Sequence, residues 1–331
     1  MTEPLPLVSI VCPAFQEEEV LPIFHQHLCE VLKRLEGSYR FEILFVDDGS
    51  RDGTYEVLQS LARIDPRVSY LSLSRNFGHQ AALTAGLEHA RGDAVVSLDV
   101  DLQHPPRVIE DLLRHWREGF DVVVTIREDD KRLSWFKRFS SQAFYRVMQF
   151  LSDTEIRIAA SDFRLLSRRA LQALLQLDEQ HRFVRGLVQW IGFRVKEISF
   201  QPDARWAGKS KYTFRRMVRL AGDGLFSFTR LPLRLPMYLA GGFLGLAFMH
   251  AMLALFRTLQ ESAAVGSWHY LLMSIHLGVG CLLASVGIVG EYLGRVHEQV
   301  KQRPLYLLKD CCMQPVRTTG EQPHAVSKLA G

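Results

Sequence analysis

The N-terminal part of the chain alternates between short apolar runs and longer amphipathic segments. The apolar runs, which predict strands, are residues 7–12, 41–46, 68–73, 94–98 and 122–126. The segments between them, which predict helices, are residues 16–35, 53–64, 78–90 and 105–116. Continuous apolar runs separated by helical segments are typical of βαβ units, in which helices cover both faces of a parallel sheet. Because such sheets bind ligands at the carboxyl ends of their strands, we expect one site along that edge.

The C-terminal part contains two uninterrupted apolar stretches. Residues 237–256 and 271–290 lack Asp, Glu, Lys and Arg, and each is long enough to cross a hydrocarbon core of about 30 Å as an α-helix. The alternative is a pair of buried helices in a large soluble core, but such helices usually keep a polar stripe. The linker 257–267 carries one Arg and one Glu, whereas the outer flanks carry Arg230, Arg234, Arg295, Lys301 and Arg303. This asymmetry predicts a membrane hairpin with both termini in the cytoplasm.

Composition excludes several classes of protein. The 331 residues are 47% hydrophobic and carry a net charge of +4, which is too small to indicate nucleic-acid binding unless the charge is clustered. The five cysteines include no C-x-x-C pair, so neither a disulfide framework nor a zinc site is favoured. The first strand is not followed by G-x-G-x-x-G, and a P-loop motif is absent. Dinucleotide oxidoreductases and P-loop enzymes are therefore disfavoured.

The strongest candidate chemistry follows the fourth predicted strand. Asp99, Asp101 and Gln103 place two carboxylates and an amide oxygen at alternate positions. Such oxygen ligands suit Mg²⁺ or Mn²⁺ shared with substrate phosphates. A bound cation there would stabilise a diphosphate leaving group. A D-x-D sequence also occurs in ordinary surface turns, but its position at a strand end favours the metal site.

Three further polar clusters follow other strands. They are residues 12–17, 47–54 and 74–79. An ordinary capped turn accounts for Asp52 and Gly53. It does not account for two successive acids, Asp47 and Asp48, at the mouth of a buried strand. We therefore expect these clusters to share the site with the D-x-D sequence.

Together these clusters resemble the family 2 glycosyltransferases that act on polyprenyl phosphates. The matching sequences are P-A-F-x-E, V-D-D-G-S-x-D-G-T, L-S-R-N-F-G, D-V-D-L-Q-H-P-P and D-F-R-L-L-S-R-R. The C-terminal G-E-Y-L-G-R and R-P-L-Y are similar to the bactoprenol branch, which has two membrane helices. The resemblance covers nearly the whole chain. The same family includes the dolichol-phosphate mannose synthases.

The resemblance implies inverting transfer of a sugar from a nucleotide diphosphate to undecaprenyl phosphate. Glucose from a UDP-linked donor is the commonest expectation, for modification of a cell-envelope glycan such as lipopolysaccharide. Mannose, N-acetylglucosamine, galactose and aminoarabinose remain open, as does a catalytically inactive membrane scaffold. A processive polysaccharide synthase is disfavoured because a Q-x-x-R-W motif is absent.

The resemblance also implies a GT-A fold and roles for individual residues. The nucleotide would be bound by Pro13, Phe15, Glu17, Asp48, Ser50 and Asp99. The divalent ion would be held by Asp99, Asp101 and Gln103, and the acceptor phosphate would be received by Arg127, Arg138, Arg205, Lys209 and Ser210. Asp162 would lie near the sugar, as a base or a positioning residue. The chain departs from the family pattern at Gln16, His79 and Ser161.

The expected architecture has four parts. A GT-A domain with a mostly parallel sheet covers residues 1–204, and basic, aromatic-rich interfacial helices cover 205–235. Two transmembrane helices within 236–293 precede a cytoplasmic tail, 294–331. Basic and aromatic interleaving can also bind single-stranded nucleic acid, but beside membrane spans it favours an anionic leaflet. We expect a multi-pass protein of the bacterial inner membrane without a nucleic-acid partner; a homo-oligomer is left open.

Overall fold

The computed structural model describes residues 4–127, 160–180, 182–201 and 267–315, with scattered residues between 241 and 256. The chain divides into two compact units, which are described separately. The first comprises Met1–Tyr145, Glu155–Phe214 and Pro304–Gly331, and the second comprises Arg146–Thr154 and Arg215–Arg303. The first unit therefore combines the N-terminal part of the sequence with its C-terminal end.

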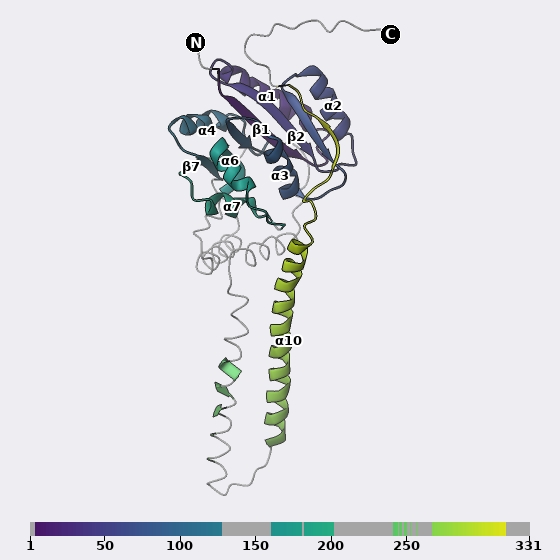
Figure 1. Ribbon diagram of the computed structural model, residues 1–331, viewed down its shortest axis with the longest axis vertical. Helices are drawn as coiled ribbons and strands as arrows, with labels where there is room; N and C mark the ends of the chain where they lie inside the picture. The colour runs from purple at the N-terminus through teal and green to yellow at the C-terminus, as the bar shows by residue number, and fades with distance from the viewer. Residues whose placement is uncertain are drawn as a thin grey trace. The chain divides into compact units, whose positions relative to one another are not determined.

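The described part of the first unit is built on an eight-stranded sheet with the strand order β7-β5-β6-β4-β1-β2-β3-β8 (Figure 1). The strands are β1 Leu7–Ala14, β2 Arg40–Asp47, β3 Val68–Leu73, β4 Ala94–Ser97, β5 Val122–Arg127, β6 Ala160–Ser167, β7 Val195–Phe200 and β8 Leu308–Cys312. The pairs β1–β2, β1–β4, β2–β3 and β5–β7 are parallel. In contrast, β6 runs antiparallel to β4 and β5, and β8 runs antiparallel to β3. The sheet is therefore mixed and GT-A-like, with parallel pairs in the majority.

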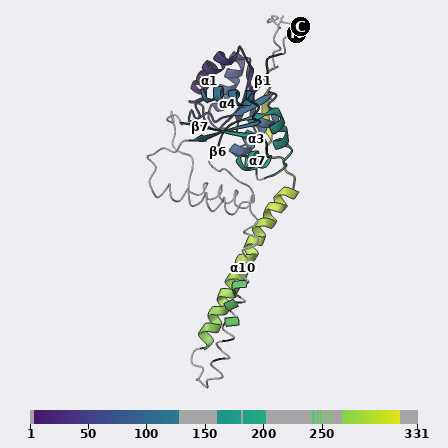
Figure 2. The same cartoon turned by 90° about the vertical axis from the view of Figure 1, so that its left-hand side faces the viewer.

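Helices pack on both sides of this sheet (Figures 1 and 2). The described helices are α1 Leu21–Leu35, α2 Thr54–Ile64, α3 His79–His89, α4 Val108–Arg117, α6 Arg168–Leu175 and α7 Val184–Trp190. Buried side chains of α1, α2 and α4 share one core cluster with alternate residues of β1 and β2. The intervening residues of β2 pack with α3 in a second cluster. Because both faces are covered, β1 is buried over its whole length, as its continuous apolar run predicts.

The predicted strands of the N-terminal part are confirmed to within two residues at each end. Two helices begin later than predicted: α4 begins at Val108 and not at residue 105, and α1 begins at Leu21 and not at residue 16. Gln16 has a φ of 56°, a left-handed conformation that an α-helix does not contain. Residues 16–20 therefore form a loop at the end of β1, where they are available to a site.

The sequence did not predict β8, which joins the sheet after α10 in chain order. In Figure 1 it is the yellow segment at the edge of the sheet. The backbone N–H of Ser74 donates to the carbonyl of Leu307 (2.8 Å), which extends the β3–β8 pairing. The hydroxyl of Tyr306 also donates to Glu88 on α3 (2.6 Å). Part of the predicted C-terminal tail is thus an edge strand of the first unit.

The second unit contains α10, Ser267–Val300. Its segment Leu277–Val300 contains an 18-residue window with a mean hydropathy of 1.6, and by length and composition the segment is able to cross a membrane. None of the most apolar window of that segment is buried within the structure. The described residues of the first apolar stretch, 241–243, 245–246, 248–249, 252 and 256, are helical. The whole of the predicted interfacial segment, 205–235, and most of the first span lie outside the described residues.

Candidate active site

The four polar clusters lie at one edge of the sheet. Strands β3, β2, β1 and β4 are consecutive neighbours and run parallel. Their carboxyl ends therefore carry the loops 74–78, 48–53, 15–20 and 98–107 side by side. This arrangement follows from the strand order alone, as parallel strands present their loops in the same direction.

The loop after β2 is held by its two acids. Asp47 accepts a hydrogen bond from the backbone N–H of Ser50 (2.9 Å) and another from the Ser72 hydroxyl (2.9 Å). Asp48 is buried and accepts from the backbone N–H groups of Phe77 (2.7 Å) and Gly78 (3.0 Å). Burial raises the pKa of Asp48 to about 6, against the opposing effect of these hydrogen bonds. The two carboxylates therefore fix the loops after β2 and β3 to each other.

The loops after β1 and β2 are also joined. The backbone N–H of Gln16 donates to the Ser50 hydroxyl (2.9 Å), and that of Glu17 donates to the Thr54 hydroxyl (2.9 Å). Gly49 has a φ of 64°, and a Cβ added there would lie 2.7 Å from the Cα of Arg75. Glycine is therefore required where the second loop passes the third.

A cavity of about 470 Å³ opens between these three loops. Phe15 and Ser50, both predicted to bind the nucleotide, line it together with Asp47. Three basic residues and an aromatic side chain complete much of its wall: Arg51, Arg75, Lys309 and Tyr55. The other predicted nucleotide residues are not among its described lining residues: Pro13 lies on β1, Glu17 and Asp48 lie on the loops after β1 and β2, and Asp99 lies on the loop after β4. The cavity thus offers aromatic surface and positive charge to a ligand.

The D-x-D loop after β4 places oxygen atoms beside a histidine. Asp99 Oδ1 lies 2.8 Å from His79 Nε2, and Asp101 accepts a hydrogen bond from the backbone N–H of Gln103 (3.1 Å). Desolvation acts to raise the pKa of Asp99, but the interaction with His79 is stronger, so the pKa of Asp99 is lowered. Asp99 also raises the pKa of His79 to about 9, which outweighs the desolvation of an imidazole whose side chain is 41% exposed. Asp99, Asp101 and Gln103 supply the hard oxygen atoms that Mg²⁺ and Mn²⁺ prefer, so the residues fit a divalent cation.

His104 connects the D-x-D loop to β6. The backbone N–H of Asp99 donates to His104 Nδ1 (3.1 Å), and His104 Nε2 lies 2.9 Å from the Ser161 hydroxyl. Because Nδ1 accepts, a neutral His104 carries its proton on Nε2 and donates it to Ser161. The imidazole also packs on Phe163, with 5.3 Å between the ring centroids. Ser161, which departs from the family pattern, is therefore in direct contact with a side chain of the D-x-D loop.

Asp162 is held between two arginines. Its Oδ1 lies 2.6 Å from Arg164 Nη2, and its Oδ2 lies 2.6 Å from Arg185 Nη2. Asp162 and Arg164 are both buried. Burial opposes ionisation of Asp162, but the two guanidinium groups hold its pKa well below the ordinary value. An ionised carboxylate with a lowered pKa is a weak base, which argues against general-base catalysis by Asp162.

Sequence reasoning did not single out Arg185 or Lys309. Arg185 is a basic residue within the otherwise apolar α7, which is a weak signal for a buried partner. Lys309 belongs to a short polar strand that has no recognisable pattern. Of the predicted acceptor residues, Arg127 ends β5 in register with Phe200 of β7. Its side chain, and the whole of Arg138, Arg205, Lys209 and Ser210, lie outside the described residues.

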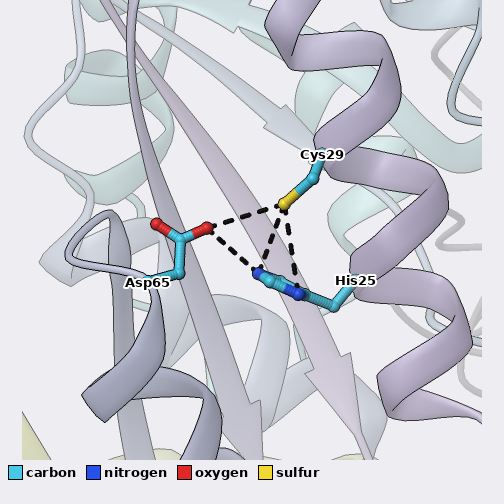
Figure 3. Close-up of side chains that lie close together, drawn as sticks. All are labelled: His25, Cys29 and Asp65. Atoms are coloured by element: carbon cyan, nitrogen blue, oxygen red, sulfur yellow. Dashed lines mark hydrogen bonds and ion pairs between the residues drawn. The ribbon is translucent and has the colours of Figure 1, made fainter.

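A second cluster of titratable groups lies apart from this edge. Figure 3 shows His25 and Cys29 of α1 facing Asp65, which follows α2; their ligand atoms lie within 4.8 Å of one another. Arg67 Nη2 contacts both Asp65 Oδ2 (2.8 Å) and Cys29 Sγ (3.2 Å). The hydrogen bond to Asp65 raises the pKa of His25 to about 9. A protonated imidazole does not ligate metal, and the guanidinium repels cations, so these residues form an ion-pair network.

Comparison with known proteins identifies the family of the chain. Residues 9–175 match the family described as Glycosyl transferase family 2. The uncharacterized glycosyltransferase YkcC of Bacillus subtilis is 38% identical over 91% of this chain and 93% of its own. The bactoprenol glucosyl transferase of Shigella phage SfII is 37% identical over 91% of this chain and 97% of its own. A solved structure of the mannosyltransferase PcManGT from Pyrobaculum calidifontis, with GDP-Man and Mn²⁺, is 16% identical, with a TM-score of 0.45 over 85% of this chain and 87% of its own.

Proposed function

The chain belongs to glycosyl transferase family 2 and is a glycosyltransferase, and we propose that it transfers glucose from UDP-glucose to undecaprenyl phosphate. The observation that carries this proposal is the shared sheet edge, on which a cationic, aromatic-lined cavity lies beside a loop of oxygen ligands. The first suits a nucleoside and the second suits a cation on its diphosphate. The name of the phage relative supports the lipid acceptor and the sugar.

The donor would occupy the three loops around the cavity and extend to the D-x-D loop. Phe15 and Ser50 are placed to contact the nucleoside, and Asp99, Asp101 and Gln103 to hold Mg²⁺ or Mn²⁺. The cation, when bound, supplies positive charge that stabilises the departing diphosphate. His79 lies against Asp99 and keeps that carboxylate ionised.

The acceptor phosphate is proposed to be its own nucleophile. A phosphate monoester is an anion near neutral pH, so one of its oxygens attacks the anomeric carbon without a protein base. The new carbon–oxygen bond forms as the bond to the nucleoside diphosphate breaks, and the configuration inverts. Asp162 then acts as a positioning residue, because its ion pairs with Arg164 and Arg185 fix it as a carboxylate near the sugar.

The acceptor side is proposed from the sequence. Arg127, Arg138, Arg205, Lys209 and Ser210 would receive the lipid phosphate. The apolar part of α10 and the stretch 237–256 would form a two-helix anchor, with the catalytic domain and both termini in the cytoplasm of a bacterium. The product, a polyprenyl-monophosphate sugar, would serve modification of a cell-envelope glycan.

A donor panel with the full-length protein in membranes tests the proposal. UDP-glucose, UDP-galactose, UDP-N-acetylglucosamine and GDP-mannose are each supplied with undecaprenyl phosphate and Mn²⁺, and the lipid product is identified by its mass. We expect a glucosylated lipid that disappears when the cation is chelated. If only another donor supports transfer, the sugar of that donor replaces glucose in the proposal. Binding of nucleotide without transfer from any donor would instead favour an inactive scaffold.

A further inference from the structure

The C-terminal strand forms a wall of the donor cavity. Lys309 of β8 lines that cavity together with residues of the loops after β1, β2 and β3. Among the described residues that line the cavity, Lys309 alone follows α10 in the sequence. Its ammonium group lies 5.2 Å from the centroid of the Tyr55 ring, which also lines the cavity.

An irregularity in the sheet directs this lysine. Ser72 pairs with Asp310 and the next residue of β3, Leu73, pairs with Leu308. Lys309 is therefore the extra residue of a bulge between the two strands. Bulges are frequent beside active sites, where they re-aim a side chain that regular pleating would place elsewhere. The side chain of Lys309 thus faces the cavity as a consequence of the strand geometry.

The residue next to Lys309 fixes the strand. The Tyr70 hydroxyl donates to Asp310 Oδ2 (3.1 Å), and the Tyr55 hydroxyl donates to the same oxygen. The backbone N–H of Gln314 donates to the Ser69 hydroxyl (3.0 Å) just beyond the strand. These contacts hold β8 on the C-terminal side of the bulge, and the Ser74–Leu307 hydrogen bond holds it on the N-terminal side, so Lys309 starts from a fixed backbone.

The strand order decides which end of the donor Lys309 faces. Asp99 follows β4, and β8 lies four strand positions away in the order β4-β1-β2-β3-β8. At about 4.8 Å per strand, β8 is about 19 Å from β4. A diphosphate held at Asp99 therefore does not reach Lys309. A donor with its phosphates on the D-x-D loop and its nucleoside in the cavity extends its base toward β8.

We propose that the Lys309 ammonium donates a hydrogen bond to the O4 carbonyl of the donor's uracil and thereby selects UDP over CDP. This inference rests on the proposed function. A lysine ammonium offers three donors and no acceptor. It pairs with the O4 carbonyl of uracil, whereas cytosine presents an amino group at the same position. The ammonium group of Lys309 thus distinguishes the two pyrimidines at position 4, where uracil presents an acceptor and cytosine presents a donor.

Nucleotide binding by full-length variants in detergent with Mn²⁺ tests this assignment. The dissociation constants of UDP and CDP are measured for the wild type, Lys309→Met and Lys309→Glu. We expect Lys309→Met to weaken UDP about tenfold, as for a hydrogen bond to a charged group, with CDP little changed. Lys309→Glu presents an acceptor and should reverse the preference toward CDP. Lys33→Met, on the exposed face of α1, is the matched control and should bind both as the wild type does.

Each other outcome is decisive. Equal weakening of UDP and CDP would place Lys309 on a phosphate and overturn the base contact. Wild-type affinities in Lys309→Met would remove Lys309 from the site altogether. A role only in folding would lower the thermal midpoint without reversing the preference in Lys309→Glu, which also overturns the proposal. If the wild type binds no nucleotide, the proposed function itself fails, and this result differs from all of the others.

Discussion

Replacing Asp162 by Asn tests how the buried arginine beside it is held. The substitution preserves shape but removes the negative charge between Arg164 and Arg185. The Arg164 side chain is only 2% exposed, and its Nε has no hydrogen-bond partner among the described residues. Its other described contact is the Val184 carbonyl at 3.5 Å. Without the carboxylate, a guanidinium would stay buried with little compensation.

The expected cost is large on the scale of protein stability. Removing one partner of a buried ion pair costs about 3–5 kcal/mol, against a total of about 5–15 kcal/mol for a typical domain. For a domain of about 200 residues, each kcal/mol lowers the unfolding midpoint by about 2–4 °C. We therefore expect Asp162→Asn to unfold about 6–20 °C below the wild type.

Thermal unfolding of the full-length protein, followed by near-UV circular dichroism, measures this shift. Asp111→Asn is the control, because Asp111 and its partner Arg114 are 49% and 63% exposed. An exposed pair contributes less than about 1 kcal/mol, so this variant should unfold within about 3 °C of the wild type. An Asp162→Asn midpoint as high as that of the control would refute the reasoning. If the shift occurs, activity of Asp162→Asn reports on chemistry only well below its midpoint.

Four further outcomes are expected from the same structure. Asp101→Asn should lower turnover about a hundredfold at saturating Mn²⁺, or about 3 kcal/mol, with an unchanged thermal midpoint; near-normal turnover would count against the metal assignment. Gly49 has a φ of 64°, so Gly49→Ala should force the loops to shift and weaken UDP binding, measured by calorimetry, at least about tenfold. The control is Gly37→Ala, which should bind UDP as the wild type does because an added Cβ there meets nothing within 4 Å. His25 has a pKa of about 9 in the folded protein against about 6.5 when unfolded, so its contribution to stability is full below pH 6.5 and is lost as the pH rises through 9. In urea titrations, the unfolding free energies of the wild type and His25→Asn should therefore differ at pH 6 and agree at pH 10. Arg127→Ala should raise the KM for undecaprenyl phosphate and leave the Kd for UDP-glucose unchanged, with partial rescue by Lys; equal loss of donor affinity would place this arginine on the diphosphate instead.

The strands that could be predicted are those buried on both faces. In β1–β5 continuous apolar runs carry the signal, and the order of loops and helices between them follows. In contrast, β6 contains Asp162 and Arg164, whose charges are compatible with a strand only because they pair with each other inside the fold. The short β8 includes Lys309 and Asp310 and lies at the sheet edge, where polar residues are usual. Its pairing with β3 depends on contacts far apart in the sequence.

The candidate site was predictable in place but not in detail. Strand ends located the loops, since parallel strands meet at one edge. The inward turn of Asp48 toward the backbone of residues 77 and 78, and the pairing of Asp162 with Arg185, require coordinates. These contacts join elements whose spacing along the chain carries no periodic signal.

The origin of β8 also sets the order in which the protein can be completed during synthesis. Tyr70 on β3 and Asp310 on β8 are 240 residues apart, which a ribosome translates in about 12–48 s at about 5–20 residues per second. Throughout that interval β3 is an open strand edge and the cavity lacks the wall that β8 supplies. The nascent chain completes this wall only after the apolar helix α10 has left the ribosome. A message broken before the codons of β8 would therefore yield the apolar helix attached to a sheet whose cavity is unfinished.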